Sequence, residues 1–207
     1  MGPTSKPVKS DIELMLAVQG GDEEAFSELV ERHRNKVVTL AHRYLKNRAD
    51  AEDLAQEIFW KVYRARARYQ PEAKFTTWLY RIAANSCLNE VRNRKNRPTH
   101  GAASLYDAGG DDTAAARVAD ETGLAPEDAV ERDELKAQVR AAVDELPERQ
   151  RLAILLNKFH GLGYEELAET MEMTVPGVKS LLVRARENVR RRIEPYLVRG
   201  AERKGTG

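Results

Sequence analysis

A stretch of small and acidic residues in the middle of the chain limits what the rest of it can fold into. Between Pro98 and Pro126, Gly, Ala, Asp, Ser and Thr dominate, and the large apolar residues are Leu105, Tyr106, Val118 and Leu124. A segment this poor in apolar side chains cannot bury enough surface to offset the entropy lost on ordering. We therefore expect a flexible acidic linker over 98–126 between two modules, over 11–97 and 127–196.

The residues on either side of this linker have the spacing of helices. After a break at Gly20-Gly21-Asp22, apolar residues recur every three or four positions from Phe26 to Leu45. That is the period of a helix with one buried face. Ala, Leu, Glu, Arg and Lys also make up about half of the chain, a composition typical of helices. The sequence therefore predicts an all-α fold of two small helical domains.

The cysteine, the histidines and the apolar runs exclude several classes of protein. One cysteine, Cys87, permits neither an internal disulfide nor a cysteine-based zinc site. The four histidines are too scattered for a metal site, and the longest apolar runs, of five residues, are too short to cross a bilayer. No set of catalytic side chains stands out. We expect a cytoplasmic protein that is not an enzyme, holds no metal or cofactor and does not insert into a membrane.

Charge is segregated along the chain. Residues 81–100 hold five basic residues against one acidic residue, 101–134 hold ten acidic against two basic, and 179–192 hold six basic against one acidic. Two basic blocks on an acidic tether suggest two modules that face a polyanion. The alternative for each block is a solvated helix face.

The second module has the spacing of a helix-turn-helix. Two predicted helices, over 164–171 and from Val175, are joined by the turn Glu172-Met173-Thr174. Thr174 is a suitable N-cap for the second helix, and Pro176 falls in its first turn, where proline is tolerated. Val178, Leu181, Leu182, Ala185, Val189 and Ile193 form the predicted buried stripe, which leaves other faces free to reach the major groove. A plain helical bundle is the alternative.

Several stretches of this module resemble a known family. Leu146-Pro147-Glu148-Arg149-Gln150, the run from Gly161 to Ala168, Val178-Lys179-Ser180 and Arg184-Ala185-Arg186 resemble the second domain of bacterial sigma factors of the extracytoplasmic-function (ECF) type. The resemblance implies contact with the polymerase β flap and with the promoter minus-thirty-five element. The DNA contacts it implies are Thr174, Pro176, Gly177, Lys179, Ser180, Arg184 and Arg186. Leu181 and Val183 depart from the Arg and His that members commonly carry, and Gly163 replaces a usual Ser.

The first module contains a polar helix face that can bind a partner helix. Asp53, Gln56 and Glu57 have the i, i+3, i+4 spacing of one face, and such a ledge can pair with a basic helix. The alternatives are a solvated acidic face and, less well supported, carboxylates that bind a metal pair. The stretch Asp50–Phe59 also resembles the ECF helix that docks on the coiled coil of the polymerase β′ subunit. The resemblance implies docking through Asp50, Asp53, Gln56 and Glu57.

A second stretch of the first module combines aromatic and basic residues. Opening a DNA duplex requires a pocket for an unstacked base and cations for the displaced backbone. The run from Phe75 to Asn85 resembles the promoter-melting segment of the ECF family, and the loop from Tyr69 to Phe75 resembles the rim of its flipped-base pocket. By periodicity Trp78 belongs to the core, whereas Phe75 and Tyr80 fit either role. The resemblance implies minus-ten recognition and melting by Lys74, Phe75, Thr76, Tyr80, Arg81, Asn85 and Arg92.

The first functional hypothesis is an ECF-type sigma factor, which directs promoter recognition and DNA opening for transcription initiation. Its implied partners are core RNA polymerase, promoter DNA and an anti-sigma factor. The alternative is a free-standing helix-turn-helix regulator with a helical sensing or dimerisation domain, which leaves the Asp50–Phe59 ledge and the Phe75–Asn85 cluster unexplained. A helical scaffold without nucleic acid is the third hypothesis.

Overall fold

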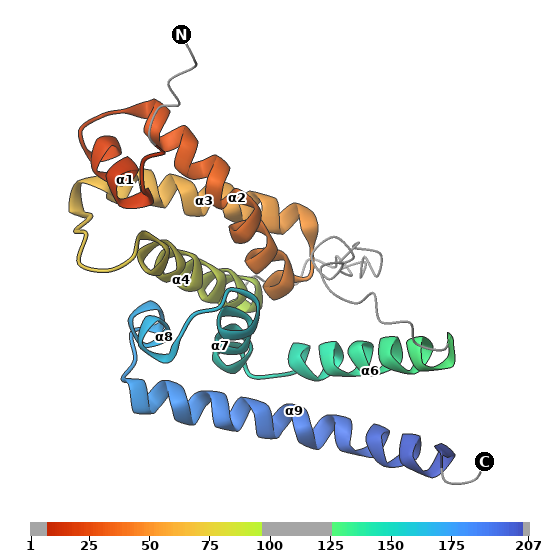
Figure 1. Ribbon diagram of the computed structural model, residues 1–207. Helices are drawn as coiled ribbons and strands as arrows, with labels where there is room; N and C mark the ends of the chain where they lie inside the picture. Colours follow the sequence, from red (N-terminus) through yellow and green to blue (C-terminus); the bar gives the residue numbers. More distant parts are fainter. Residues whose placement is uncertain (1–7, 97–125, 205–207) are drawn as a thin grey trace.

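The computed structural model describes residues 8–96 and 126–204, and every regular element within these ranges is a helix (Figure 1). The first module consists of α1 (Asp11–Gln19), α2 (Glu23–Leu45), α3 (Arg48–Ala65), the 3-10 turn η1 (Arg66–Arg68) and α4 (Phe75–Asn96). The second consists of α6 (Pro126–Asp144), α7 (Glu148–Phe159), α8 (Tyr164–Met171) and α9 (Val175–Lys204). The predicted all-α fold is confirmed. The predicted acidic linker, apart from Pro126, lies outside the described residues, so its flexibility stays a prediction.

Side-chain caps explain where the first helices begin. The Asp22 carboxylate accepts a hydrogen bond from the Ala25 amide at 2.9 Å and so caps α2. Ser10 and Glu13 form a reciprocal capping box at the start of α1, and Asn47 caps α3. Each cap satisfies an amide that has no partner within its own helix.

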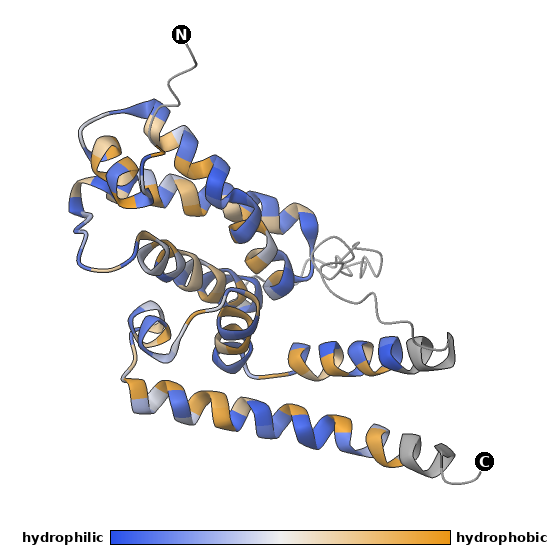
Figure 2. Ribbon diagram, viewed as in Figure 1, coloured by the Kyte–Doolittle hydropathy of each residue, from blue (hydrophilic) through white to orange (hydrophobic). Residues whose placement is uncertain are grey.

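The helices of the first module pack through their apolar faces. Figure 2 shows apolar and hydrophilic residues alternating along each helix, the pattern expected for helices with one buried face. Leu14 of α1, Leu29 of α2, Ile58 of α3 and Leu79 of α4 are almost completely buried. This core holds α3 and α4 in place, and they carry the polar residues singled out in the sequence.

The second module is built around α7, α8 and α9. Leu152, Leu156, Leu167 and Leu182 form its centre, and Gln150 on α7 accepts a hydrogen bond from Asn188 on α9 at 2.8 Å. Helix α6 packs along α9 (Figure 1). The steep arrangement of α8 and α9 is that of a helix-turn-helix.

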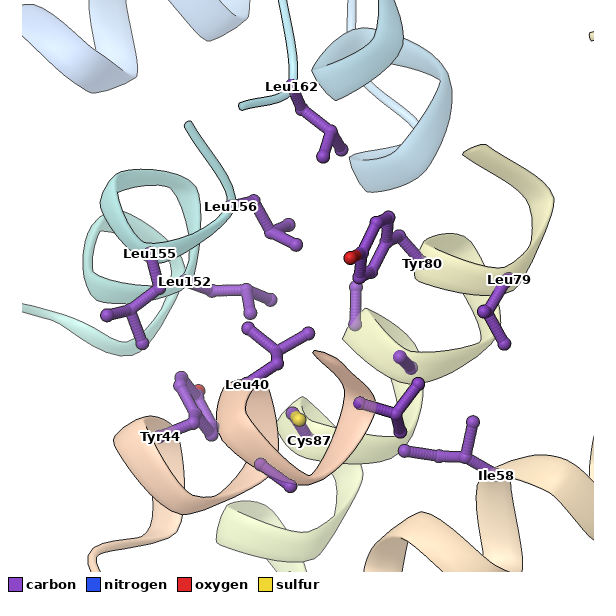
Figure 3. Packing of buried hydrophobic residues seen from close by; sticks show 14 of the residues in the cluster. Leu40, Tyr44, Ile58, Leu79, Tyr80, Cys87, Leu152, Leu155, Leu156 and Leu162 are labelled. Atoms are coloured by element: carbon purple, nitrogen blue, oxygen red, sulfur yellow. The ribbon is translucent and has the colours of Figure 1, made fainter. Parts of the chain in front are cut away.

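The two modules share one continuous buried core. Figure 3 shows Leu152 and Leu156 of α7 and Leu162 facing Leu40 and Tyr80 of the first module. Helix α8 also packs against α4, and α7 against α2. Sequence periodicity predicted each module separately but carried no signal for the contact between them.

Candidate functional site

The polar ledge on α3 is exposed. Asp53, Gln56 and Glu57 project to solvent from a helix whose opposite face, including Leu54 and Ile58, is buried. The Glu57 carboxylate forms an ion pair with Lys61 one turn later, at 2.6 Å. These three side chains are therefore accessible to a partner.

Asp50 differs from the other predicted docking residues in its contacts. Its carboxylate lies 2.8 Å from the Arg94 guanidinium on α4, and Arg94 also binds Glu90 at 2.8 Å. The Asp50–Arg94 pair ties α3 to the end of α4, and the Glu90–Arg94 pair lies within α4 itself. Asp50 is thus engaged within the fold. Among the contacts described, Asp53 and Gln56 have no such partner.

An exposed tryptophan extends the α3 ledge. The Trp60 side chain is 60% exposed and stacks on Tyr63, with ring centroids 6.1 Å apart and planes 18° apart. Trp60 follows Gln56 by four positions and Glu57 by three, so it lies on the same helix face. Sequence analysis missed this residue, although its spacing from the ledge would have indicated it.

Helix α4 carries a strip of exposed polar residues. Arg81, Asn85, Asn89 and Arg92 follow one another at three- and four-residue intervals, and all are exposed. Buried residues on the opposite face, Leu79, Ala83 and Cys87, fix its direction. The structure thus brings Arg81, Asn85 and Arg92 together on one accessible face, which we term the α4 strip.

The loop before α4 borders a hollow beside this strip. Arg68, Gln70, Glu72 and Ala73 line it from the loop side, Thr77, Trp78 and Arg81 line it from α4, and Glu169 lines it from α8. Trp78 is only half-buried and contacts Tyr69 edge-on, with centroids 5.0 Å apart. The hollow therefore combines an aromatic edge with guanidinium groups, the materials needed to hold an unstacked base.

Two of the predicted melting aromatics are buried, and Phe75 is the first of them. Phe75 is 2% exposed and packs among His33, Tyr69 and Trp78. Helix α4 starts at Phe75, and the Thr77 amide donates a hydrogen bond to the Lys74 carbonyl at 3.0 Å. Phe75 therefore anchors the loop that borders the hollow.

The start of α4 faces the second module. Lys74 is exposed but pairs with Glu166 on α8, with 2.9 Å between Nζ and Oε1. Tyr80, the second buried aromatic, is 4% exposed and forms a hydrogen bond with His160, which follows α7. Thr76 lines a cavity between the modules together with Lys74 and Tyr80. Tyr80 is therefore buried against the second module, and Lys74, although exposed, has an acidic partner there, whereas Arg81, Asn85 and Arg92 lie on the exposed face of α4.

The start of α9 presents the predicted helix-turn-helix face. The Thr174 hydroxyl accepts a hydrogen bond from the Gly177 amide at 3.2 Å, which confirms the predicted cap. Glu172 adopts the left-handed conformation (φ 52°) in the turn. Val178, Leu182 and Ala185 are buried, and the outer face is exposed at Pro176, Lys179, Ser180, Arg184 and Arg186. Gly177 is half-buried beneath Thr174, and a Cβ there would lie 3.1 Å from the Thr174 hydroxyl.

The residues described contain no arrangement suited to metal or thiol chemistry. No group of three His, Cys, Asp or Glu side chains within 8–96 and 126–204 is placed to hold a metal ion. Burial raises the pKa of the Cys87 thiol to about 12, so it stays protonated. Among the helices in these ranges, none is both long and apolar enough to cross a membrane.

One helical module contains a helix-turn-helix, and the other carries the α4 strip and the α3 ledge. This combination is typical of transcription proteins that bind DNA and protein through separate helices. Family models agree with this class. Residues 29–97 match sigma-70 region 2, and residues 136–189 match sigma-70 region 4.

Curated relatives match over nearly the whole chain. The RNA polymerase sigma-H factor of Pseudomonas aeruginosa is 37% identical over 189 residues, 91% of this chain and 96% of that protein. The ECF RNA polymerase sigma-E factor of Haemophilus influenzae is 37% identical over 188 residues, 91% of this chain and 97% of that protein. The chain belongs to the sigma-70 family, as a member of its ECF sigma factors.

A solved structure has the same fold. The structure of CnrH in complex with the cytosolic domain of CnrY covers 90% of this chain and 99% of CnrH, with a TM-score of 0.63 and 22% identity. The similarity extends over both modules, which supports the all-α, two-module description.

Proposed function

We propose that this chain acts in the cytoplasm as a non-catalytic initiation subunit that binds core RNA polymerase, recognises a promoter and opens it. The observation that carries the proposal is the separation of three exposed surfaces on three helices: the α3 ledge, the α4 strip and the outer face of α9. Each surface has a chemistry that suits a different partner. No cofactor is required for any of the three contacts.

The outer face of α9 is proposed to read duplex DNA. Lys179, Ser180, Arg184 and Arg186 are exposed in the N-terminal half of this helix. Helix N-termini and Arg or Lys side chains bind phosphates and guanine edges in the major groove. The partner of this face is proposed to be the minus-thirty-five element.

The α4 strip and the adjacent hollow are proposed to hold the opened minus-ten strand. Arg81 and Arg92 supply cations for the backbone, Asn85 supplies hydrogen bonds to a base edge, and Trp78 borders the hollow. Base stacking contributes roughly 1–3 kcal/mol per base. Lys74 lies exposed just before the same helix and is paired with Glu166, whereas Tyr80 is buried against the second module.

The α3 ledge is proposed to dock on the β′ coiled coil of the polymerase. Asp53 and Glu57 offer charge for a basic partner helix, and Trp60 offers exposed aromatic area beside them. Aromatic side chains next to charge pairs are common anchors of protein interfaces. The flap of the β subunit is proposed to contact the second module.

The test is reconstitution with core polymerase. Purified protein is expected to co-elute with core enzyme and to start transcripts from promoters that core enzyme alone ignores. A free-standing regulator would instead bind duplex DNA specifically without core enzyme and would not co-elute with it. Loss of co-elution in a folded protein contradicts the proposal.

A further inference from the structure

The last residue of α1 holds the backbone of the segment that leads from α3 to α4. The side-chain amide of Gln19 donates hydrogen bonds to the carbonyls of Ala67 and Tyr69, each at 3.3 Å. In the sequence these two carbonyls flank Arg68, which lines the hollow beside the α4 strip. Figure 1 shows α1 beside the end of α3, where this segment begins. Gln19 therefore fixes the backbone from which Arg68 reaches the hollow.

The start of α1 supports the other end of the same loop through a buried pair. The Asp11 carboxylate lies 2.7 Å from Nε2 of His33 on α2. His33 is 4% exposed, and the centroid of its ring lies 5.3 Å from that of Phe75 at the start of α4. Phe75 in turn contacts Tyr69 and Trp78. The two ends of α1 thus hold the loop by hydrogen bonds to its backbone and by aromatic packing behind it.

Between these two supports the loop has few constraints of its own. Gln70 and Glu72 are exposed, and both line the hollow. Within the part of the chain that the structure describes, their side chains form no hydrogen bond or ion pair. A segment with few bonds and little buried area opens locally at low cost. The shape of the loop therefore depends on how its ends are held.

We propose that Gln19 is a positioning residue for strand opening, which keeps the loop over 69–74 in the shape that completes the hollow before DNA arrives. The inference rests on the proposed function of the α4 strip and its hollow. Gln19 does not itself line the hollow, so it acts through the loop. A site that is already held in its bound shape loses less free energy to ordering when it binds. Removal of the two hydrogen bonds should therefore slow opening and leave duplex contact by α9 unchanged.

The variants separate hydrogen bonding from side-chain bulk. Gln19→Met keeps an unbranched neutral side chain but removes the donor, whereas Gln19→Lys restores a donor. Gln138→Met and Gln138→Lys are the matched controls, because Gln138 is exposed on α6 and forms no hydrogen bond with the residues described. Gln19 is exposed as well, so its replacement leaves no cavity in the core. The thermal midpoint of Gln19→Met should fall by less than about 4 °C.

The first measurement reports the loop in the free chain. A Trp60→Phe background leaves Trp78 as the one tryptophan of the chain, and Trp78 contacts Tyr69 with centroids 5.0 Å apart. Acrylamide quenching of Trp78 should rise about twofold in Gln19→Met, because a loosened loop exposes the indole. Quenching should stay at the wild-type level in Gln19→Lys and in both Gln138 controls. Unchanged quenching in Gln19→Met overturns the inference and leaves the proposed function unaffected.

The second measurement reports opening. Chains with Trp60 intact are assembled with core polymerase on a promoter that carries 2-aminopurine in the minus-ten strand, and the opening rate is measured at saturating holoenzyme. Gln19→Met should open about fivefold more slowly, which corresponds to about 1 kcal/mol, the net value of a typical hydrogen bond. Gln19→Lys and the two controls should open at the wild-type rate. A wild-type rate in Gln19→Met, or no recovery in Gln19→Lys, overturns the inference.

The proposed function is tested beside it on the same template. Arg81→Ala and Asn85→Ala remove side chains of the α4 strip itself and should slow opening in every background. If both variants open at the wild-type rate, the α4 strip is not the melting surface, and this outcome contradicts the proposed function itself. Slow opening by these two variants with a wild-type rate in Gln19→Met rejects the positioning role alone.

Discussion

The phenol oxygen of Tyr80 lies 3.0 Å from Nδ1 of His160, and this hydrogen bond joins α4 to the end of α7 across 80 positions of sequence. Burial, reinforced by the nearby charges of Arg43 and Lys36, lowers the pKa of His160 to about 4. Burial also raises the pKa of Tyr80 to about 12. Both partners are therefore neutral at neutral pH, and the contact between the modules depends on His160 staying uncharged.

Acid should separate the two modules and so open the closed chain, the state in which they share one buried core. The closed state holds His160 with a pKa of about 4 against an ordinary value of 6.5, so it binds fewer protons than the open state between these pH values. Closure is then complete above about pH 6.5 and weakens as pH falls toward 4, by at most about 1.4 kcal/mol per pH unit. Energy transfer between dyes attached at Arg48→Cys in α3 and Glu187→Cys in α9 should fall over this range.

The charged and titratable groups around His160 must be distinguished from His160 itself as the source of this pH dependence. Tyr80 faces it from α4, Lys36 and Arg43 from α2, and Glu166 lines the same cavity from α8. The pKa of Glu166 is lowered from 4.5 by its hydrogen bond with Lys74, so Glu166 stays ionised over most of the range. His160→Gln, which keeps a neutral polar side chain, should remove the dependence between pH 6.5 and 5. A persistent dependence would assign the effect to another group.

The α3 ledge should control polymerase binding. Asp53→Lys with Glu57→Lys is expected to abolish co-elution with core enzyme, because both side chains then carry positive charge and repel a basic partner helix. The free energy of unfolding should change by less than about 1 kcal/mol per residue, because exposed charges contribute little. Glu31→Lys with Glu187→Lys makes the same charge change at exposed positions outside the ledge and should leave core binding intact.

Trp60 should act as an anchor within the same interface. Trp60→Ala is expected to weaken core binding by about 2 kcal/mol, a typical cost for removing an interface aromatic anchor. The side chain is 60% exposed, so the thermal midpoint of the free protein should barely shift. Affinity for core enzyme is measured by fluorescence anisotropy. Wild-type affinity in the variant would restrict the interface to the polar ledge.

Substitutions in the two proposed DNA-binding surfaces should affect different steps of transcription initiation. Lys179→Ala or Arg184→Ala should weaken closed-complex formation and reduce its salt dependence, because each removes a phosphate contact. Asn85→Ala should leave upstream duplex contact intact but reduce permanganate-reactive thymines, and a premelted template should restore transcription. The comparison is made at saturating holoenzyme. Normal opening by the Asn85 variant there would show that α4 is not the melting surface.

The halves of the chain should stay together after the connection between them is cut. A site-specific protease sequence inserted between His100 and Pro126 lies outside both modules, and the shared core of Leu40, Tyr80 and Leu156 should hold the cleaved halves together. We expect co-elution in low salt and separation in high salt, as the ion pairs of Lys46, Lys74 and Lys95 are screened. Separate elution in low salt would contradict the closed contact.

Local patterns in the sequence were sufficient for the helices and their caps. The cap at Asp22, the cap at Thr174 and the buried stripe through Val178 and Leu182 are all set by residues within one or two helical turns. Such neighbours are fixed by the helix period itself. The exposed faces of α3 and α9 followed from the same periodicity, because a helix with one buried face must expose the other.

Tertiary structure decided the rest. Whether Tyr80 faces solvent or core, whether Asp50 pairs with Arg94, and whether Lys74 is free or held by Glu166 depend on residues 44 to 92 positions away. Periodicity reports which face of a helix is apolar, not which surface covers it. The sequence by itself thus determined the family, the helices and the chemistry of their exposed faces. The packing of α8 on α4, which depends on burying apolar area between distant segments, determined which of those residues the closed chain leaves accessible.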